Sequence, residues 1–131
     1  EEVELIAALV RYHRKAMPKA THPEWAVASP AVRAKIEGLA GMLRVADGLD
    51  RRRLAVVSSI EASTTAAGVH LSLGAFQDIT PEMEGARFKA DLFERAFGTT
   101  LTLEAVQRSY GSGLGEAEAN AAEIDAASLS G

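Results

Sequence analysis

The hydrophobic pattern changes its period after Arg53, and this change constrains the fold more than any other feature of the chain. Before Arg53, apolar residues recur three and four positions apart, as on one face of a helix. After it, stretches rich in β-branched residues alternate between apolar and polar positions, which is typical of strands. The sequence therefore predicts an α+β fold, with a helical segment over residues 1–53 and a small β-rich unit over residues 54–109.

The helical segment is predicted to hold two helices joined by a proline-containing loop. The first covers residues 2–16 and stops before Pro18, and the second begins at Ser29-Pro30 and continues to about Arg53. Two helices with one apolar face each cannot close a core alone, so we expect them to pack against partners. The predicted apolar faces contain Val3, Ile6, Leu9, Val10, His13 and Met17 in the first helix and Val32, Ile36, Leu39, Ala40, Leu43 and Ala46 in the second.

The β-rich unit is predicted to have the order strand, strand, helix, strand. The strands are expected over residues 54–62, 68–75 and 100–106, and the helix begins at Thr80-Pro81 and ends at Gly98. One face of the second strand and the apolar stripe of the helix are predicted to contain Val69, Leu71, Leu73 and Ala75, and Met83, Ala86, Ala90, Phe93 and Phe97. Residues 110–131 carry four acids and no base among many Gly, Ala and Ser, so we expect a flexible acidic tail.

The composition excludes several classes of protein and site. The chain contains no Cys, which excludes disulfide scaffolds, thiolate metal sites and cysteine nucleophiles. No apolar run approaches the ~18–20 residues that span a bilayer, and the acidic start has the wrong sign for a signal peptide. We therefore expect a soluble, cytoplasmic protein with no membrane partner. Because the first residues already follow an amphipathic pattern with no cap before them, we expect the chain to begin inside a larger protein.

Polar groups that can carry chemistry fall on the predicted apolar faces. Asp47 lies in the middle of the stripe of the second helix, with Asp50 at its edge, and His13 lies on the face of the first helix. Since a buried carboxylate must be paired, hydrogen-bonded or bound to a metal ion, two interpretations stay open. In one, Asp47 pairs with an arginine or a backbone amide. In the other, His13, Asp47 and Asp50 are metal ligands, and His22 folds back from its loop to complete the set.

Basic residues are concentrated in the first 53 positions, which carry ten Lys and Arg against seven Asp and Glu, although the net charge of the chain is −4. They form two clusters, one of Arg11, Arg14, Lys15 and Lys19 and one of Arg51, Arg52 and Arg53. These clusters are either solvated surfaces or a surface that binds a polyanion, since phosphate groups bind repeated point charges and arginine forks. The only aromatic residues near the clusters are Tyr12 and Trp25, so sequence-specific nucleic-acid binding is not expected.

Three stretches follow one another along the chain, RYHRKAMPKATHPEW (11–25), LAGMLRVADGLDRRR (39–53) and KADLFERAFGTTLTL (89–103), and the first two combine uncommon residues in order. Together they resemble the C-terminal part of the exopolyphosphatase and guanosine-pentaphosphate phosphatase family (Ppx/GppA). The resemblance covers about residues 1–106. It implies the last half of an HD-like helical bundle followed by a small β-rich region, without the actin-like lobes that bind phosphate and metal and perform hydrolysis in that family.

The resemblance implies an accessory region of a phosphoric-anhydride hydrolase, with no catalytic residue or cofactor of its own and with a divalent metal such as magnesium serving the parent enzyme. It also implies that the chain dimerises and binds inorganic polyphosphate or guanosine pentaphosphate. Two other functions stay open, namely a stand-alone HD-type metal-dependent phosphohydrolase and a non-enzymatic dimerisation module. The residues that the resemblance implies in phosphate binding are Arg11, Arg14, Lys15, Lys19, Arg51, Arg52 and Arg53.

Overall fold

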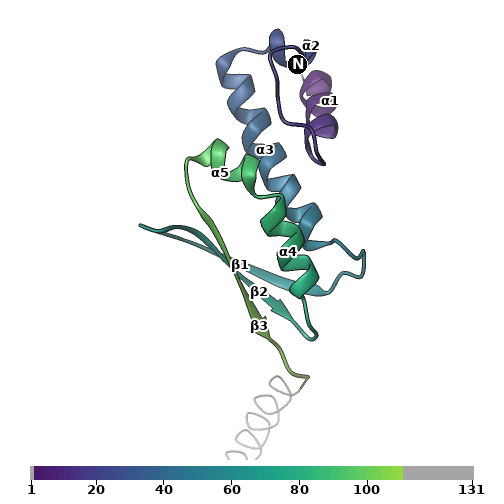
Figure 1. The fold of residues 1–131 in the computed structure, drawn as a ribbon, viewed down its shortest axis with the longest axis vertical. Helices are drawn as coiled ribbons and strands as arrows, with labels where there is room; N and C mark the ends of the chain where they lie inside the picture. Colours follow the sequence, from purple (N-terminus) through teal and green to yellow (C-terminus); the bar gives the residue numbers. More distant parts are fainter. Residues whose placement is uncertain (1, 111–131) are drawn as a thin grey trace, which may run out of the picture.

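The computed structural model describes residues 2–110, which form helices at one end of the molecule and a small sheet at the other, with the longest helix extending between them (Figure 1). The predicted α+β class and the order strand, strand, helix, strand are therefore confirmed. The predicted tail over residues 110–131 lies, except for its first residue, outside the described residues. In chain order, the elements are α1 (Glu2–Tyr12), α2 (Pro23–Ala26), α3 (Pro30–Leu49), β1 (Val57–Thr65), β2 (Gly68–Ala75), α4 (Thr80–Phe88), α5 (Asp91–Phe97) and β3 (Leu101–Gln107).

The sheet has the strand order β1-β2-β3, with β1 antiparallel to β2 and β2 parallel to β3. A tight turn at Ala66 and Ala67 closes the β1–β2 hairpin, whereas α4 and α5 form the crossover that parallel neighbours require. Strand β2 has the predicted bounds, and its alternate apolar residues contact the helices as predicted. Strand β1 begins three residues later than predicted, because the chain at Ala55 takes up a left-handed backbone with φ 50°.

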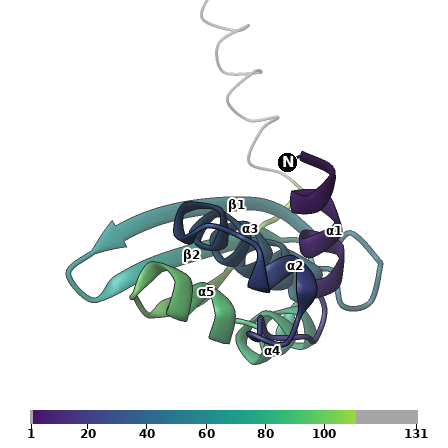
Figure 2. The same ribbon diagram turned by 90° about the horizontal axis from the view of Figure 1, so that it is seen from above.

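Two hydrophobic clusters form the core, and α3 contributes to both. The first joins the C-terminal half of α3 to the sheet and α4, and the second joins α1 to the N-terminal half of α3 and to α5. Helix α3 therefore connects the helical segment with the β-rich unit (Figure 2). The buried residues of the two clusters are Val45, Leu49, Val56, Leu73, Ala75, Ile79, Ala86, Ala90 and Leu101, and Ala8, Tyr12, Ile36, Ala40 and Leu92.

Helix α3 begins as predicted, with Ser29 as the N-cap whose Oγ accepts a hydrogen bond from the Val32 amide at 3.3 Å. It ends at Leu49, before the predicted end. Only part of its predicted apolar face is buried, because the helix is rotated toward α4 and α5. Of the predicted residues, Ile36 and Ala40 are buried, but Leu39, Leu43 and Ala46 are exposed.

Glycines form the part of α3 that contacts α4 and α5. A Cβ added to Gly48 would lie 2.5 Å from the Cα of Ala86, and a Cβ added to Gly41 would lie 2.8 Å from the Cα of Phe93. Real side chains cannot approach a backbone so closely, so glycine is what allows these helices to touch. A search for large apolar side chains finds Val45 and Leu49 in the contact with α4, but it cannot find the positions of close backbone approach, because glycine has no side chain.

The face that helix α1 buries overlaps only in part with the predicted one, and of the predicted residues Leu9 and Met17 pack against the core. The helix packs through Ala8 and Tyr12, whereas Val3, Ile6 and Val10 are exposed. The small Ala8 side chain lets α1 approach α3, and the hydroxyl of the buried Tyr12 is satisfied by side chains of the connecting loop. The helix ends at Tyr12 rather than near residue 16.

The prediction of a single helix between residues 80 and 98 is wrong, because this segment forms two helices, α4 and α5, which are separated at Lys89 and Ala90. Ala90 is the N-cap of α5 and makes no side-chain cap hydrogen bond, and Asp91, the first residue of α5, accepts a hydrogen bond at Oδ1 from the Leu92 amide at 2.8 Å. Gly98 ends α5 as predicted, in a left-handed conformation with φ 57°. The break is important for the site, because Lys89 lies in it.

Candidate functional site

A basic cleft lies beside the C-terminal end of α3, where the segment after α1 and the α4–α5 junction come together. It consists of two adjoining hollows of about 830 Å³ and 280 Å³. Among residues 2–110, six of its lining side chains are cationic and two are carboxylates, so an anion is the class of ligand that it favours. Its lining residues are Arg14, Lys15, Arg44, Asp47, Gly48, Arg51, Arg53, Gly85, Phe88, Lys89 and Asp91.

Asp47 is at the centre of the cleft and is paired with two cations. Its Oδ1 accepts a hydrogen bond from Arg53 Nη2 at 2.7 Å, and its Oδ2 accepts one from Lys89 Nζ. These hydrogen bonds, first of all the one from Lys89, lower the pKa of Asp47 even though its burial acts in the opposite direction. The structure thus supports the interpretation in which Asp47 pairs with an arginine, and it adds Lys89 as a second partner.

Arg53 reaches Asp47 because its own backbone is left-handed, with φ 57°. This conformation is costly for a residue with a side chain, and here it turns the arginine back over the end of α3. Arg53 also donates through Nη1 to Asp50 Oδ2 at 3.1 Å. Both carboxylates that were metal candidates on α3 therefore face the same guanidinium.

Arg52 does not line the cleft and is instead part of a joint, which we define as Arg52, Asp78 and Glu82. Its Nε and Nη2 donate to the two carboxylate oxygens of Glu82 at 2.7 and 2.8 Å, and Nη2 also donates to the Asp78 carbonyl at 2.9 Å. The Glu82 side chain is 1% exposed, and the arginine hydrogen bonds lower its pKa against the effect of burial. The joint connects α4 to the residues that follow α3.

The structure brings together only some of the basic residues that the sequence singled out. Arg14 and Lys15 line the larger hollow and Arg51 lines the smaller one. Within residues 2–110 these three side chains have no ion-pair or hydrogen-bond partner. Arg11 pairs with Glu24 at 3.0 Å, and neither it nor the exposed Lys19 lines the cleft.

The metal candidates are not arranged as a ligand set. His13 Nδ1 lies 2.7 Å from the carbonyl of Val10 in its own helix, and His22 Nδ1 lies 2.8 Å from the Tyr12 hydroxyl. Within residues 2–110, no three His, Asp or Glu side chains are placed to hold a metal ion. Asp47 does not fit magnesium either, because two cations already occupy its oxygens. The magnesium implied for the parent enzyme stays a prediction about residues elsewhere in it.

Four side chains of the cleft were not predicted from the sequence, namely Arg44, Phe88, Lys89 and Asp91. Lys89 is 42 positions away from Asp47 in the chain, so no local spacing could connect them. Arg44 lies between apolar positions of α3. The argument applied to Asp47, that a charged residue on a buried face needs a partner, therefore applies to Arg44 as well. Phe88 is the last residue of α4, lies outside the predicted apolar stripe and is 85% exposed at the cleft.

Comparison with known proteins adds no relative. The chain matches no protein-family model and no curated protein sequence. In the described part of the chain, none of the helices has the length and apolar character needed to cross a bilayer.

Proposed function

We propose that this chain is the C-terminal accessory region of a Ppx/GppA-type phosphohydrolase and that it binds a phosphate chain in the basic cleft. The observation that carries the proposal is that the three stretches behind the family resemblance meet at this cleft. The first supplies Arg14 and Lys15, the second supplies Arg51 and Arg53, and the third supplies Lys89. Cleavage of terminal phosphates takes place in another part of the parent enzyme.

The form of the cleft suits a long anion better than a small enclosed substrate. Each phosphate of a chain carries negative charge, so several separate cations bind it better than one deep pocket. Arg14, Lys15 and Arg51 provide such cations and are not neutralised by carboxylates of the described chain. Inorganic polyphosphate and guanosine pentaphosphate are the ligands that we propose.

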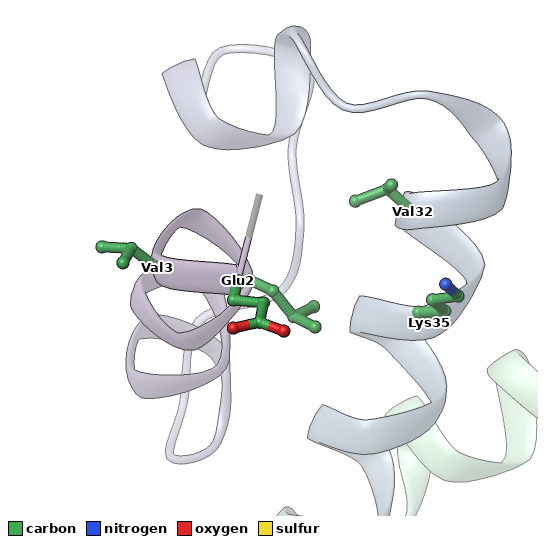
Figure 3. Close-up of a pocket in the computed structure, with 5 residues that line it drawn as sticks. Glu2, Val3, Val32 and Lys35 are labelled. Atoms are coloured by element: carbon green, nitrogen blue, oxygen red, sulfur yellow. The ribbon is translucent and has the colours of Figure 1, made fainter.

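We also propose that the chain contributes to a homodimer through the exposed apolar residues of α1 and α3. A groove of about 720 Å³ opens between these helices, and Figure 3 shows Val32 on α3 directed toward α1, while Val3 on α1 points away from α3. Exposed apolar surface of this kind marks an interaction site in a soluble protein. The exposed side chains are Val3, Ile6, Val10, Leu39, Met42 and Leu43.

Binding of inorganic polyphosphate to two matched double variants tests the proposed function. Arg14→Ala/Lys15→Ala removes two cations of the cleft, and Lys19→Ala/Lys35→Ala removes two exposed cations outside it. We expect the affinity to fall about tenfold or more in the first variant and less than about twofold in the second.

Two results would contradict the proposal. An equal loss in both variants would show that only net charge matters, and no binding by the unmodified chain would remove phosphate binding altogether. A dimer in light scattering without any polyphosphate affinity would favour the alternative function, a non-enzymatic dimerisation module.

A further inference from the structure

Arg44 is a buried arginine whose hydrogen bonds are incomplete. Its side chain is 6% exposed and lines the larger hollow of the cleft. Nη2 donates to Asp91 Oδ1 at 2.9 Å, and Nη1 donates to the Ala16 carbonyl at 3.4 Å. Nε is buried and has no partner within the described part of the chain. Since buried donors are nearly always satisfied, this nitrogen needs an explanation.

A comparison with Arg52 shows what is missing. Arg52 presents Nε and Nη2 together to both oxygens of Glu82, which is the bidentate geometry that a guanidinium favours. Arg44 presents the same edge to Asp91, but only Nη2 is used. The edge is therefore half filled. The Asp91 side chain that fills it is 53% exposed, and its Oδ1 also accepts a hydrogen bond from the Leu92 amide at 2.8 Å, which a competing oxyanion must displace as well.

The surroundings of Arg44 favour an oxyanion as the second partner. Arg14, Lys15 and Lys89 line the same hollow, and the carboxylates there are outnumbered by cations. Two oxygens of a phosphoryl group match the spacing of one guanidinium edge, and further oxygens remain for the amines.

We infer that the floor of the cleft is a subsite for a single phosphoryl group, which Arg44 anchors through Nε and Nη2 after displacing Asp91. The inference rests on the proposed function, which supplies the class of ligand. It adds one residue, Arg44, that fixes the position of a phosphoryl group within the basic cleft. Arg14 and Lys15 then hold the phosphates that follow along the chain.

Pyrophosphate binding to variants of the full chain tests this subsite. Asp91→Asn removes the competing carboxylate, so we expect pyrophosphate affinity to rise about threefold or more. Arg44→Lys keeps the positive charge but loses the two-pronged edge, so we expect affinity to fall about tenfold. Glu37→Gln is the matched control, because it removes a carboxylate that pairs with Arg95 outside the cleft, and we expect a change of less than about twofold.

The NMR signal of the Arg44 Nε–Hε group provides a readout that a purely structural arginine would not change. We expect pyrophosphate to shift this signal, which is assigned by its absence in Arg44→Lys. If Arg44→Lys does not fold, the Arg44 signal is assigned as the one that shifts in Asp91→Asn. The pyrophosphate affinity of Asp91→Asn then tests the subsite by itself. An affinity that does not rise in Asp91→Asn, or a signal that does not move, would overturn the subsite.

The two proposals fail separately. Polyphosphate binding that depends on Arg14 and Lys15, together with no response of Arg44, overturns the subsite and leaves the proposed function standing. Pyrophosphate binding that shifts the Arg44 signal, without any affinity for long polyphosphate, supports the subsite and overturns the proposed function.

Discussion

The joint and the basic cleft are built from neighbouring arginines that follow α3, yet they use them in opposite ways. In the joint, Arg52 is matched by a carboxylate that is 1% exposed. In the cleft, Arg51 has no partner within residues 2–110. The difference comes from what faces each side chain after folding, and not from the type of residue. A run of three arginines is therefore not one functional unit, and each member needs its own test.

The largest expected effect is on the stability of the joint. Arg52→Ala leaves the Glu82 carboxylate buried without its partner, and we expect a loss of about 2–3 kcal/mol of unfolding free energy, less than for a fully buried pair because Arg52 is 37% exposed. Arg51→Ala is the matched control, and we expect a change below about 0.5 kcal/mol, as for most surface substitutions. Urea unfolding followed by circular dichroism measures both. Equal stabilities of the two variants would show that the joint is not structural.

The next effect concerns the close approach of α3 and α4, which holds the joint and the cleft side by side. Gly48→Ala places a methyl group against the backbone of Ala86, and we expect a destabilisation of about 1–3 kcal/mol. Gly38→Ala is the control on the same helix, because its methyl group would meet only the movable ring of Phe97, at 3.3 Å. We expect it to be neutral or slightly stabilising. A stable Gly48→Ala protein in thermal unfolding would contradict this packing.

A smaller effect is the response of the joint to pH. The hydrogen bonds from Arg52 hold the pKa of Glu82 below its ordinary value of 4.5 in the folded chain. The native state therefore binds fewer protons than the unfolded state, so this contribution is fully present above that value and is lost as the pH falls through the folded pKa. We expect the free energy of unfolding of Glu82→Gln to decrease less steeply than that of the unmodified chain as the pH falls below about 4.5. A pH profile of unfolding that is unchanged in this variant would assign the acid sensitivity to other groups.

Much of the fold could be predicted from local pattern. The alternation in β2 and the Ser29-Pro30 start of α3 were sufficient, because each depends on neighbouring residues only. The buried faces of α1 and α3 could not be predicted in the same way. Both helices make part of their contacts through small residues, such as Ala8 and Gly48, and several of their large apolar side chains, such as Ile6 and Leu43, are exposed.

The candidate site could be predicted only in part, for a related reason. Arg14, Lys15 and Arg51 are visible as basic clusters in the sequence, and they do line the cleft. Which arginines are neutralised depends on carboxylates and amines brought from distant positions. Arg52 meets Glu82 over 30 positions, and Asp47 meets Lys89 over 42. Sequence spacing contains no information about such pairs.

The salt dependence of polyphosphate affinity tests most directly whether the cleft, and not the net basic charge, binds the phosphate chain. Each cation that contacts phosphate adds about 0.7–0.9 to the slope of log affinity against log salt concentration. We predict that Arg14→Ala/Lys15→Ala/Arg51→Ala reduces the slope by about 2–3, while Lys19→Ala/Lys35→Ala leaves it nearly unchanged. The same slope in the triple variant and the unmodified chain would contradict phosphate binding in the cleft.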